Sequence, residues 1–147
     1  MRLLVQVVDS AEVRVGGETT VAIGAGLLVY VGIALDDSVE VACAAAARCG
    51  NARILPSPGR PFDLSALQSG CPILVVSSFS LYGNLSSGRR PSWSLAAKPA
   101  DARPVYDAFV AEIAALGLEV SAGQFGAEMV IHGANHGPMN LLIEVGP

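Results

Sequence analysis

The chain opens with the stretch LLVQVVDSAEVRVGGETTVAI (residues 3–23), in which apolar side chains alternate with polar ones around a glycine pair. A period of two is typical of strands that bury one face, so we predict strands at residues 3–8, 12–15 and 19–23. Gly16-Gly17 allows the positive φ angles that a tight turn requires. This opening therefore predicts antiparallel sheet.

The spacing of apolar residues changes further along the chain and predicts two helices. The first extends from Asp36 to Gly50, with acidic residues at its start and a glycine that can end it. The second begins near Asp101, tolerates Pro104 in its first turn and stops at Gly117. Its apolar face consists of four residues spaced for burial: Val105, Phe109, Ile113 and Leu116.

Other apolar runs predict further strands. Residues 27–34 are almost continuously apolar, which is typical of a strand buried on both faces. A β-branched run at 73–79 precedes an exposed loop at 82–88. Two last strands, 129–132 and 141–145, flank a loop that carries Asn135-His136-Gly137-Pro138. With no linker or repeat, residues 1–147 are predicted to form a single domain of the α/β class, α+β type.

The composition is that of a chain able to bury a core. Apolar residues make up 52% of it, and the mean hydropathy is +0.50. No stretch approaches the length of a membrane span and no cleavage-site signature follows Met1, so a cytoplasmic location is expected. Cys43, Cys49 and Cys71 form no C-x-x-C pair and are interpreted as reduced core or helix residues.

The net charge of −4 is unevenly distributed. Residues 41–103 contain seven basic and two acidic residues, a balance of +5, and the flanks carry the remaining −9. This distribution permits a basic face on an acidic protein, as contact with nucleic acid phosphates would require. The equally weighted alternative to one basic face is that these arginines are scattered over the surface. The seven basic residues are Arg48, Arg53, Arg60, Arg89, Arg90, Lys98 and Arg103.

Three groups of residues are candidates for chemistry. Ser77-Ser78-Phe79-Ser80 ends a predicted strand, where hydroxyls and backbone N–H groups can meet a substrate carbonyl; hydroxyls that merely cap the strand are the alternative. His132 and His136 would form a zinc pair on a helix, but Gly133 and Gly137-Pro138 forbid that helix, so no metal is expected. Gly137-Pro138 alone is an ordinary turn dipeptide, although glycine lets the backbone approach a ligand closely.

Four segments are informative when taken together: SSFSLYGNLSSGRRPSW (77–93), PADARPVYDAF (99–109), GQFGAEM (123–129) and NHGP (135–138). In order and spacing they resemble one family, the D-aminoacyl-tRNA deacylases, also called D-tyrosyl-tRNA deacylases. Residues 6–15 and 24–28 are similar too.

This resemblance implies a mostly antiparallel, barrel-like sheet with two main helices, in a homodimer that hydrolyses the ester of D-aminoacyl-tRNA. The Gly137-Pro138 step of one subunit would enter the partner's pocket and hold the α-amino group, excluding L side chains but not glycine. Backbone N–H groups around Phe79 and Ser80 would bind the developing oxyanion.

The resemblance also assigns the remaining site residues. Substrate contacts are expected from Met129, Asn135, Met139 and Asn140. Phosphate contacts with tRNA are expected from Arg89, Arg90 and Lys98. No cofactor and no metal are implied.

The chain departs from the family pattern at three places near the expected pocket. Ser78 stands where glutamine is usual, Val7 where arginine is usual, and Met139-Asn140 where Val-Thr is usual. Three hypotheses follow: a D-aminoacyl-tRNA deacylase, a divergent paralog that edits with relaxed chirality, or a catalytically weak dimer that binds aminoacyl-tRNA.

Overall fold

The computed structural model describes residues 1–86 and 88–146, and its organising element is the first strand. β1 (Arg2–Val15) is joined to β2 (Glu18–Ile23) through Gly16 and Gly17, whose φ angles are 61° and 91°. The hairpin predicted from the glycine pair is confirmed. The prediction of two separate strands within β1 is wrong, because the last strand of the sheet pairs with it from Arg2 to Arg14 and holds it extended throughout.

The sheet combines antiparallel and parallel pairs. Its order is β2-β1-β3-β6-β7, with β8 also paired to β1. β1 is antiparallel to β2, β3 and β8, whereas β3–β6 and β6–β7 are parallel. The added strands are β3 (Gly26–Gly32), β6 (Ile73–Ser77), β7 (Val120–Ala122) and β8 (Val130–Glu144).

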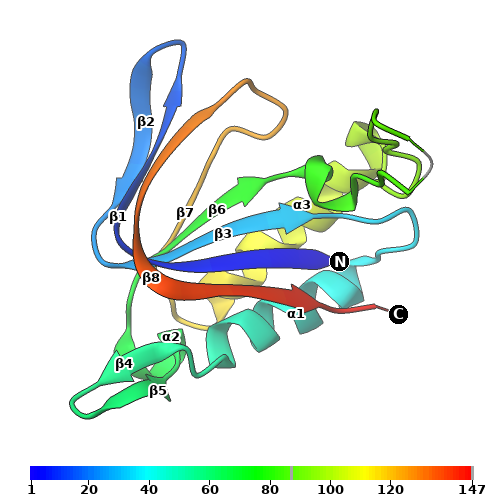
Figure 1. Cartoon of the computed structure of the whole chain (residues 1–147). Coiled ribbons are helices and arrows are strands. Elements are labelled where there is room, and N and C mark those ends of the chain that lie inside the picture. The colour runs from blue at the N-terminus through cyan, green and yellow to red at the C-terminus, as the bar shows by residue number, and fades with distance from the viewer. Residues whose placement is uncertain (87, 147) are drawn as a thin grey trace.

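The sheet bends into a nearly closed barrel, as the resemblance implied. Figure 1 shows the β1–β2 hairpin and the first half of β8 rising away from the other strands. β2 then lies close to β6 and β7. The mixed α/β class with a barrel-like sheet is confirmed.

Two long helices cover one face of the sheet (Figure 1). α1 (Val39–Asn51) begins after Ser38, whose Oγ accepts a hydrogen bond from the Val41 N–H at 3.4 Å. α3 (Pro99–Ala115) begins two residues earlier than predicted, so Pro104 lies inside the helix and not in its first turn. Phe109 and Ile113 of α3 are fully buried in the main core. No helix of the described residues is long and apolar enough to cross a membrane.

Several short elements were not predicted. β4 (Leu55–Ser57) and β5 (Arg60–Leu64) form a separate hairpin, followed by α2 (Ala66–Ser69). These segments are too short for a hydrophobic period to emerge from the sequence. They lie at the lower left of Figure 1, at the other end of the molecule from the segment that follows β6.

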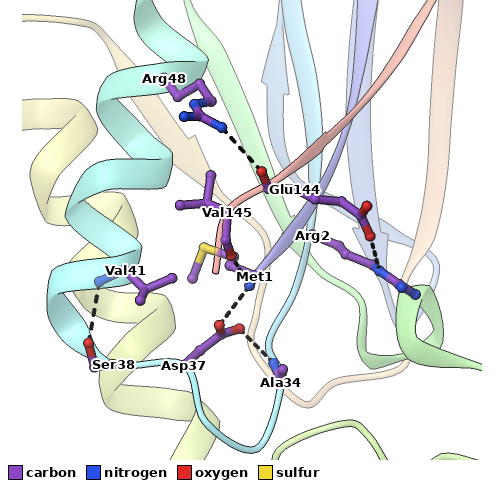
Figure 2. A network of polar contacts seen from close by, with 9 residues as sticks. All are labelled: Met1, Arg2, Ala34, Asp37, Ser38, Val41, Arg48, Glu144 and Val145. Atoms are coloured by element: carbon purple, nitrogen blue, oxygen red, sulfur yellow. Dashed lines mark hydrogen bonds and ion pairs between the residues drawn. The ribbon is translucent and has the colours of Figure 1, made fainter. Parts of the chain in front are cut away.

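A network of polar contacts ties the beginning of β1 to the end of β8 (Figure 2). The Met1 ammonium donates to Asp37 Oδ1 at 2.6 Å, and Asp37 Oδ2 accepts from the Ala34 N–H at 2.7 Å. Arg2 Nε donates to Glu144 Oε1 at 2.6 Å, and its guanidinium lies 4.6 Å from the centre of the Tyr82 ring. Burial of Tyr82 raises the pKa of its hydroxyl to about 12. These contacts anchor one end of the strand pair whose middle carries Gly137-Pro138.

Among the glycines of the described sheet, Gly26 has the least room for a Cβ atom, which leads to a prediction about stability. A Cβ at this position would lie 2.3 Å from the Pro72 carbonyl oxygen, a backbone atom that cannot move aside cheaply. We expect Gly26→Ala to lower the free energy of unfolding by about 1–3 kcal/mol. Urea unfolding measures this change. Gly24→Ala is the matched control, because nothing lies within 4 Å of its Cβ position; equal effects from the two variants would refute the steric argument.

Candidate active site

The predicted catalytic segment Ser77-Ser78-Phe79-Ser80 lies where β6 ends and a short 3-10 helix begins. Ser77 is the last residue of β6, and the Ser78 N–H donates to the Val31 carbonyl at 2.8 Å as the last contact with β3. The chain then turns into η1 (Phe79–Tyr82), so the prediction that the strand continues to Phe79 is wrong. Strand pairing with β3 ends at Ser77, and after the Ser78 N–H bond the chain leaves the sheet.

This turn leaves two backbone donors available. The first hydrogen bond of η1 is donated by the Leu81 N–H to the Ser78 carbonyl at 3.3 Å. The N–H groups of Phe79 and Ser80 precede it and have no partner within the helix. The notable feature of this strand end is therefore a pair of N–H groups that have no hydrogen-bond partner in the described part of the chain and lie beside two serine hydroxyls.

The two serine hydroxyls bind each other. Ser78 Oγ and Ser80 Oγ are 3.0 Å apart. Among the described hydrogen bonds neither hydroxyl contacts an imidazole; His132 and His136 lie on β8, where His136 contacts Asp9. In α1, burial raises the pKa of the Cys49 thiol to about 12, which leaves it protonated at neutral pH. Within the described residues, this strand end therefore offers backbone N–H groups and two mutually bonded hydroxyls.

A cavity of about 480 Å³ opens beside the strand end. Four predicted site residues meet there: Ser77, Ser78, Phe79 and Met129. The rest of the lining is largely apolar and comes from the end of β3, the segment before α3, the start of α3 and the segment before β8. These other residues are Val31, Ile33, Trp93, Ala96, Ala97, Pro99, Ala102, Phe125, Gly126 and Ala127.

Two aromatic residues of this lining were not among the predicted site residues. The Trp93 ring meets Phe79 edge-on at 5.2 Å between centroids, and a Cβ on Gly83 would lie 2.6 Å from Trp93 Cζ3. Phe125 packs 5.3 Å from the Tyr106 ring, whose hydroxyl donates to the Val75 carbonyl at 3.2 Å. Phe79 and Trp93 are 61% and 42% exposed, so both rings face an open cavity. A lone tryptophan in a polar loop was the signal that could have pointed to Trp93.

Gly137-Pro138 lies in a bulge of β8. The prediction of two strands flanking a loop is wrong, because β8 is one strand from Val130 to Glu144. Asn135 pairs with Val8 and Asn140 with Gln6, so four residues (136–139) lie opposite Val7 alone. The Gly137-Pro138 peptide bond is cis. Gly137 and Pro138 are both exposed.

The structure does not bring this bulge to the cavity of its own chain. Ser77 pairs with Val31, which pairs with Leu3, whereas the bulge faces Val7, four residues further along β1. At about 3.3 Å per residue that is roughly 13 Å along the strands. Figure 1 shows the same separation, with the bend of β8 at the left and η1 at the right. The predicted contacts Asn135, Met139 and Asn140 belong with the bulge, and Met139 packs partly against the main core.

The predicted tRNA contacts are close in sequence to residues that line the cavity. Arg89 and Arg90 lie on the loop that also carries Trp93, and Lys98 directly precedes Pro99 of the cavity wall. Within the described ranges none of the three forms an ion pair with a carboxylate. In contrast, Arg53 and Arg60 both contact Asp63 near the distant β4–β5 hairpin. Within the described residues, the basic middle of the chain is thus divided between paired and unpaired cations.

No group of three His, Cys, Asp or Glu side chains that could hold a metal ion occurs in residues 1–86 and 88–146.

Sequence comparisons identify the family. The family model described as D-Tyr-tRNA(Tyr) deacylase matches residues 4–144. A D-aminoacyl-tRNA deacylase of Acidothermus cellulolyticus is 47% identical over 146 residues, which is 99% of each chain. This chain belongs to the D-aminoacyl-tRNA deacylase family. Members are hydrolases of the aminoacyl-tRNA ester bond, and the enzyme class predicted from the sequence is confirmed.

Further comparisons agree with the family assignment. A D-aminoacyl-tRNA deacylase of Streptomyces coelicolor is 45% identical over 146 residues, which covers 99% of this chain and 100% of the relative. The solved structure of a c-Myc DNA unwinding element binding protein superposes with a TM-score of 0.92 at 32% identity, covering 100% of this chain and 99% of that one. A probable eukaryotic D-amino acid tRNA deacylase superposes with a TM-score of 0.84 at 19% identity, covering 97% of both chains, and supports the deacylase fold.

Proposed function

We propose that this chain hydrolyses D-aminoacyl-tRNA to free D-amino acid and tRNA, and that it also accepts glycyl-tRNA. The observation that carries the proposal is a pair of backbone N–H groups with no hydrogen-bond partner among the described residues, those of Phe79, which lines the apolar cavity, and of its neighbour Ser80, in a chain of this family. Backbone donors held in place can stabilise the negative charge that develops on an ester oxygen during hydrolysis. Because aminoacyl-tRNA is the substrate, we expect the protein to act in the cytoplasm.

The cavity suits the 3′-terminal nucleoside of an aminoacyl-tRNA. Its aromatic residues Phe79, Trp93 and Phe125 offer faces and edges to a base, and base stacking on aromatic rings requires no particular base sequence. Arg89, Arg90 and Lys98, which form no ion pair within the described ranges, are close in sequence to the lining residues Trp93 and Pro99, and we expect them to contact the phosphates that lead to the terminal nucleoside. In this arrangement the ester carbonyl points to the N–H groups of η1.

The active site is completed by a second copy of the chain. Gly137-Pro138 is exposed on a bulge remote from its own cavity, and in a symmetric dimer each bulge would enter the partner's cavity. The Gly137 and Pro138 carbonyls would accept hydrogen bonds from the α-amino group of the substrate. An L side chain would then collide with this backbone, a D side chain would point away, and glycine would enter without conflict.

A deacylation assay tests this function. The protein is incubated with tRNA carrying D-tyrosine, L-tyrosine, glycine or L-alanine, and ester loss is followed against buffer alone. We expect loss from D-tyrosyl-tRNA and glycyl-tRNA, with the L esters unchanged. Hydrolysis of L-alanyl-tRNA as fast as the D ester would establish the relaxed-chirality alternative instead. Retained tRNA binding without hydrolysis of any ester would leave only a binding protein.

Ser78 provides a separate prediction about rate. Its hydroxyl is bound to Ser80 and is too short to act as the longer glutamine amide would on a substrate carbonyl. We expect Ser78→Gln to raise kcat for D-tyrosyl-tRNA by a factor of about 2–10, the effect of one added neutral hydrogen bond. Ser78→Asn, which carries the same amide one methylene shorter, is the control and should not raise kcat. A fall in kcat for Ser78→Gln would show that the serine has a role of its own.

A further inference from the structure

We propose that three side-chain amides, those of Gln6, Asn135 and Asn140, position the Gly137-Pro138 bulge and thereby set its discrimination between D and L substrates. We call these three residues the amide clamp. The inference rests on the proposed function, because it concerns how the bulge selects.

The amide clamp forms a continuous chain of hydrogen bonds across the base of the bulge. Gln6 Nε2 donates to Asn140 Oδ1 at 2.6 Å, and Asn140 Nδ2 donates to Asn135 Oδ1 at 3.2 Å. Asn135 Nδ2 donates to the Val7 carbonyl at 2.9 Å and to the Met139 carbonyl at 3.4 Å. Both ends of the bulge and the opposite strand are thus linked through these amides.

The bulge needs such a link because the sheet does not hold it. Four residues lie opposite Val7, and the regular pairing of β8 with β1 is interrupted between Asn135 and Asn140. The Val7 side chain is only 7% exposed and belongs to the main core, against which Met139 alone of the four bulge residues packs in the described structure. Among the described residues, the one atom within 4 Å of a Cβ on Gly137 is Asn135 Oδ1, at 3.9 Å, its chain neighbours aside. Asn135 is therefore the nearest support of the selecting residue.

His136 provides a weaker second attachment. Its Nδ1 lies 3.0 Å from Asp9 Oδ1, but the two side chains are 58% and 68% exposed, so water competes with the contact. This contact holds the tip of the bulge, whereas the amide clamp holds both of its ends. We therefore assign the positioning role to the amides.

A loosened bulge changes selectivity in a defined direction. Exclusion of an L side chain requires a backbone that does not yield, so loss of the amide clamp lets L esters react faster. The α-amino group of a D ester is held by the same backbone, so D esters react more slowly. Both changes lower the ratio of kcat/KM for the D ester to that for the L ester.

The test measures this ratio with D-tyrosyl-tRNA and L-tyrosyl-tRNA for the parent chain and its variants. We expect the ratio to fall about tenfold in Asn140→Ala, which loses two hydrogen bonds, and about threefold in Gln6→Ala, which loses one. The double variant should match Asn140→Ala, because Gln6 has then already lost its partner. The control is Asn51→Ala, which removes an exposed amide that donates to Ala47 at 2.9 Å on α1; its ratio should equal the parent's.

The outcomes separate this inference from the proposed function. If the parent chain hydrolyses neither ester, or both equally, the proposed function fails before any variant is considered. If the parent is selective and both single variants keep its ratio, the proposed function stands and the positioning role is wrong. Melting temperatures accompany each measurement, and Gln6→Ala decides the question should Asn140→Ala prove unstable.

Discussion

Replacing Phe79 with proline is expected to lower kcat for D-tyrosyl-tRNA by about 10²–10³-fold relative to Phe79→Ala. Proline has no N–H, so the variant removes one of the two donors proposed to bind the oxyanion. The local backbone accepts proline, since Phe79 is the first residue of η1 and Ser78, with φ −147° and ψ 85°, is outside the helical region that a following proline disfavours. Single-turnover kinetics with saturating enzyme measure the chemical step.

The comparison with Phe79→Ala isolates the N–H from the ring. Both variants lose the aromatic side chain that faces the cavity and contacts Trp93, but only the proline variant loses the donor. Similar melting temperatures would show that neither variant has lost its fold. A kcat for Phe79→Pro within threefold of that for Phe79→Ala would mean that this N–H does not stabilise the transition state.

Gly137→Leu is expected to lower hydrolysis of D-tyrosyl-tRNA by about 10²-fold or more, because a side chain at this position would displace the substrate in the partner's cavity. Its own chain has room for the addition, since only Asn135 Oδ1 lies within 4 Å of the Cβ position among the described residues. The melting temperature should therefore remain close to that of the parent. Gly24→Leu, at another open position, is the control for an added apolar side chain and should keep full activity.

Combining the two defects in one dimer tests where the bulge acts. Phe79→Pro and Gly137→Leu chains are co-expressed with different tags, and the heterodimer is purified through both. One of its sites would join an intact strand end to an intact bulge, so about half of the parent activity should return. Activity no higher than that of either homodimer would show that the bulge does not act across a subunit boundary.

Local periodicity was enough to predict the elements that bury one continuous face. The β1–β2 hairpin follows from the alternation and from Gly16-Gly17, and α1 and α3 follow from apolar residues at helical spacing. The sequence did not reveal β8 as one strand. Glycine and proline at 137 and 138 predicted a loop there, yet pairing with β1 on both sides keeps the segment in the sheet.

Part of the candidate site was predicted from the sequence, and part of it was not. Ser77, Ser78, Phe79 and Met129 do line one cavity, because β6 ends where the segment before β8 passes. Trp93 and Phe125 were missed, since an aromatic residue in a loop gives no sign of which cavity it will face. The register of β8 on β1, a matter of long-range pairing, separates Gly137-Pro138 from that cavity.

By itself the sequence determined the family, the hairpin, both long helices and the residue types available for chemistry. Each of these features depends on residues a few positions apart or on motifs that follow one another in a fixed order along the chain. The tertiary structure alone decided that Gly137-Pro138 lies on a bulge opposite Val7, at the other end of the strands from Ser77 and Phe79. That placement depends on which residues of β1 and β8 pair across the sheet. The pairing energy comes from segments more than a hundred residues apart, so no local sequence pattern predicts it.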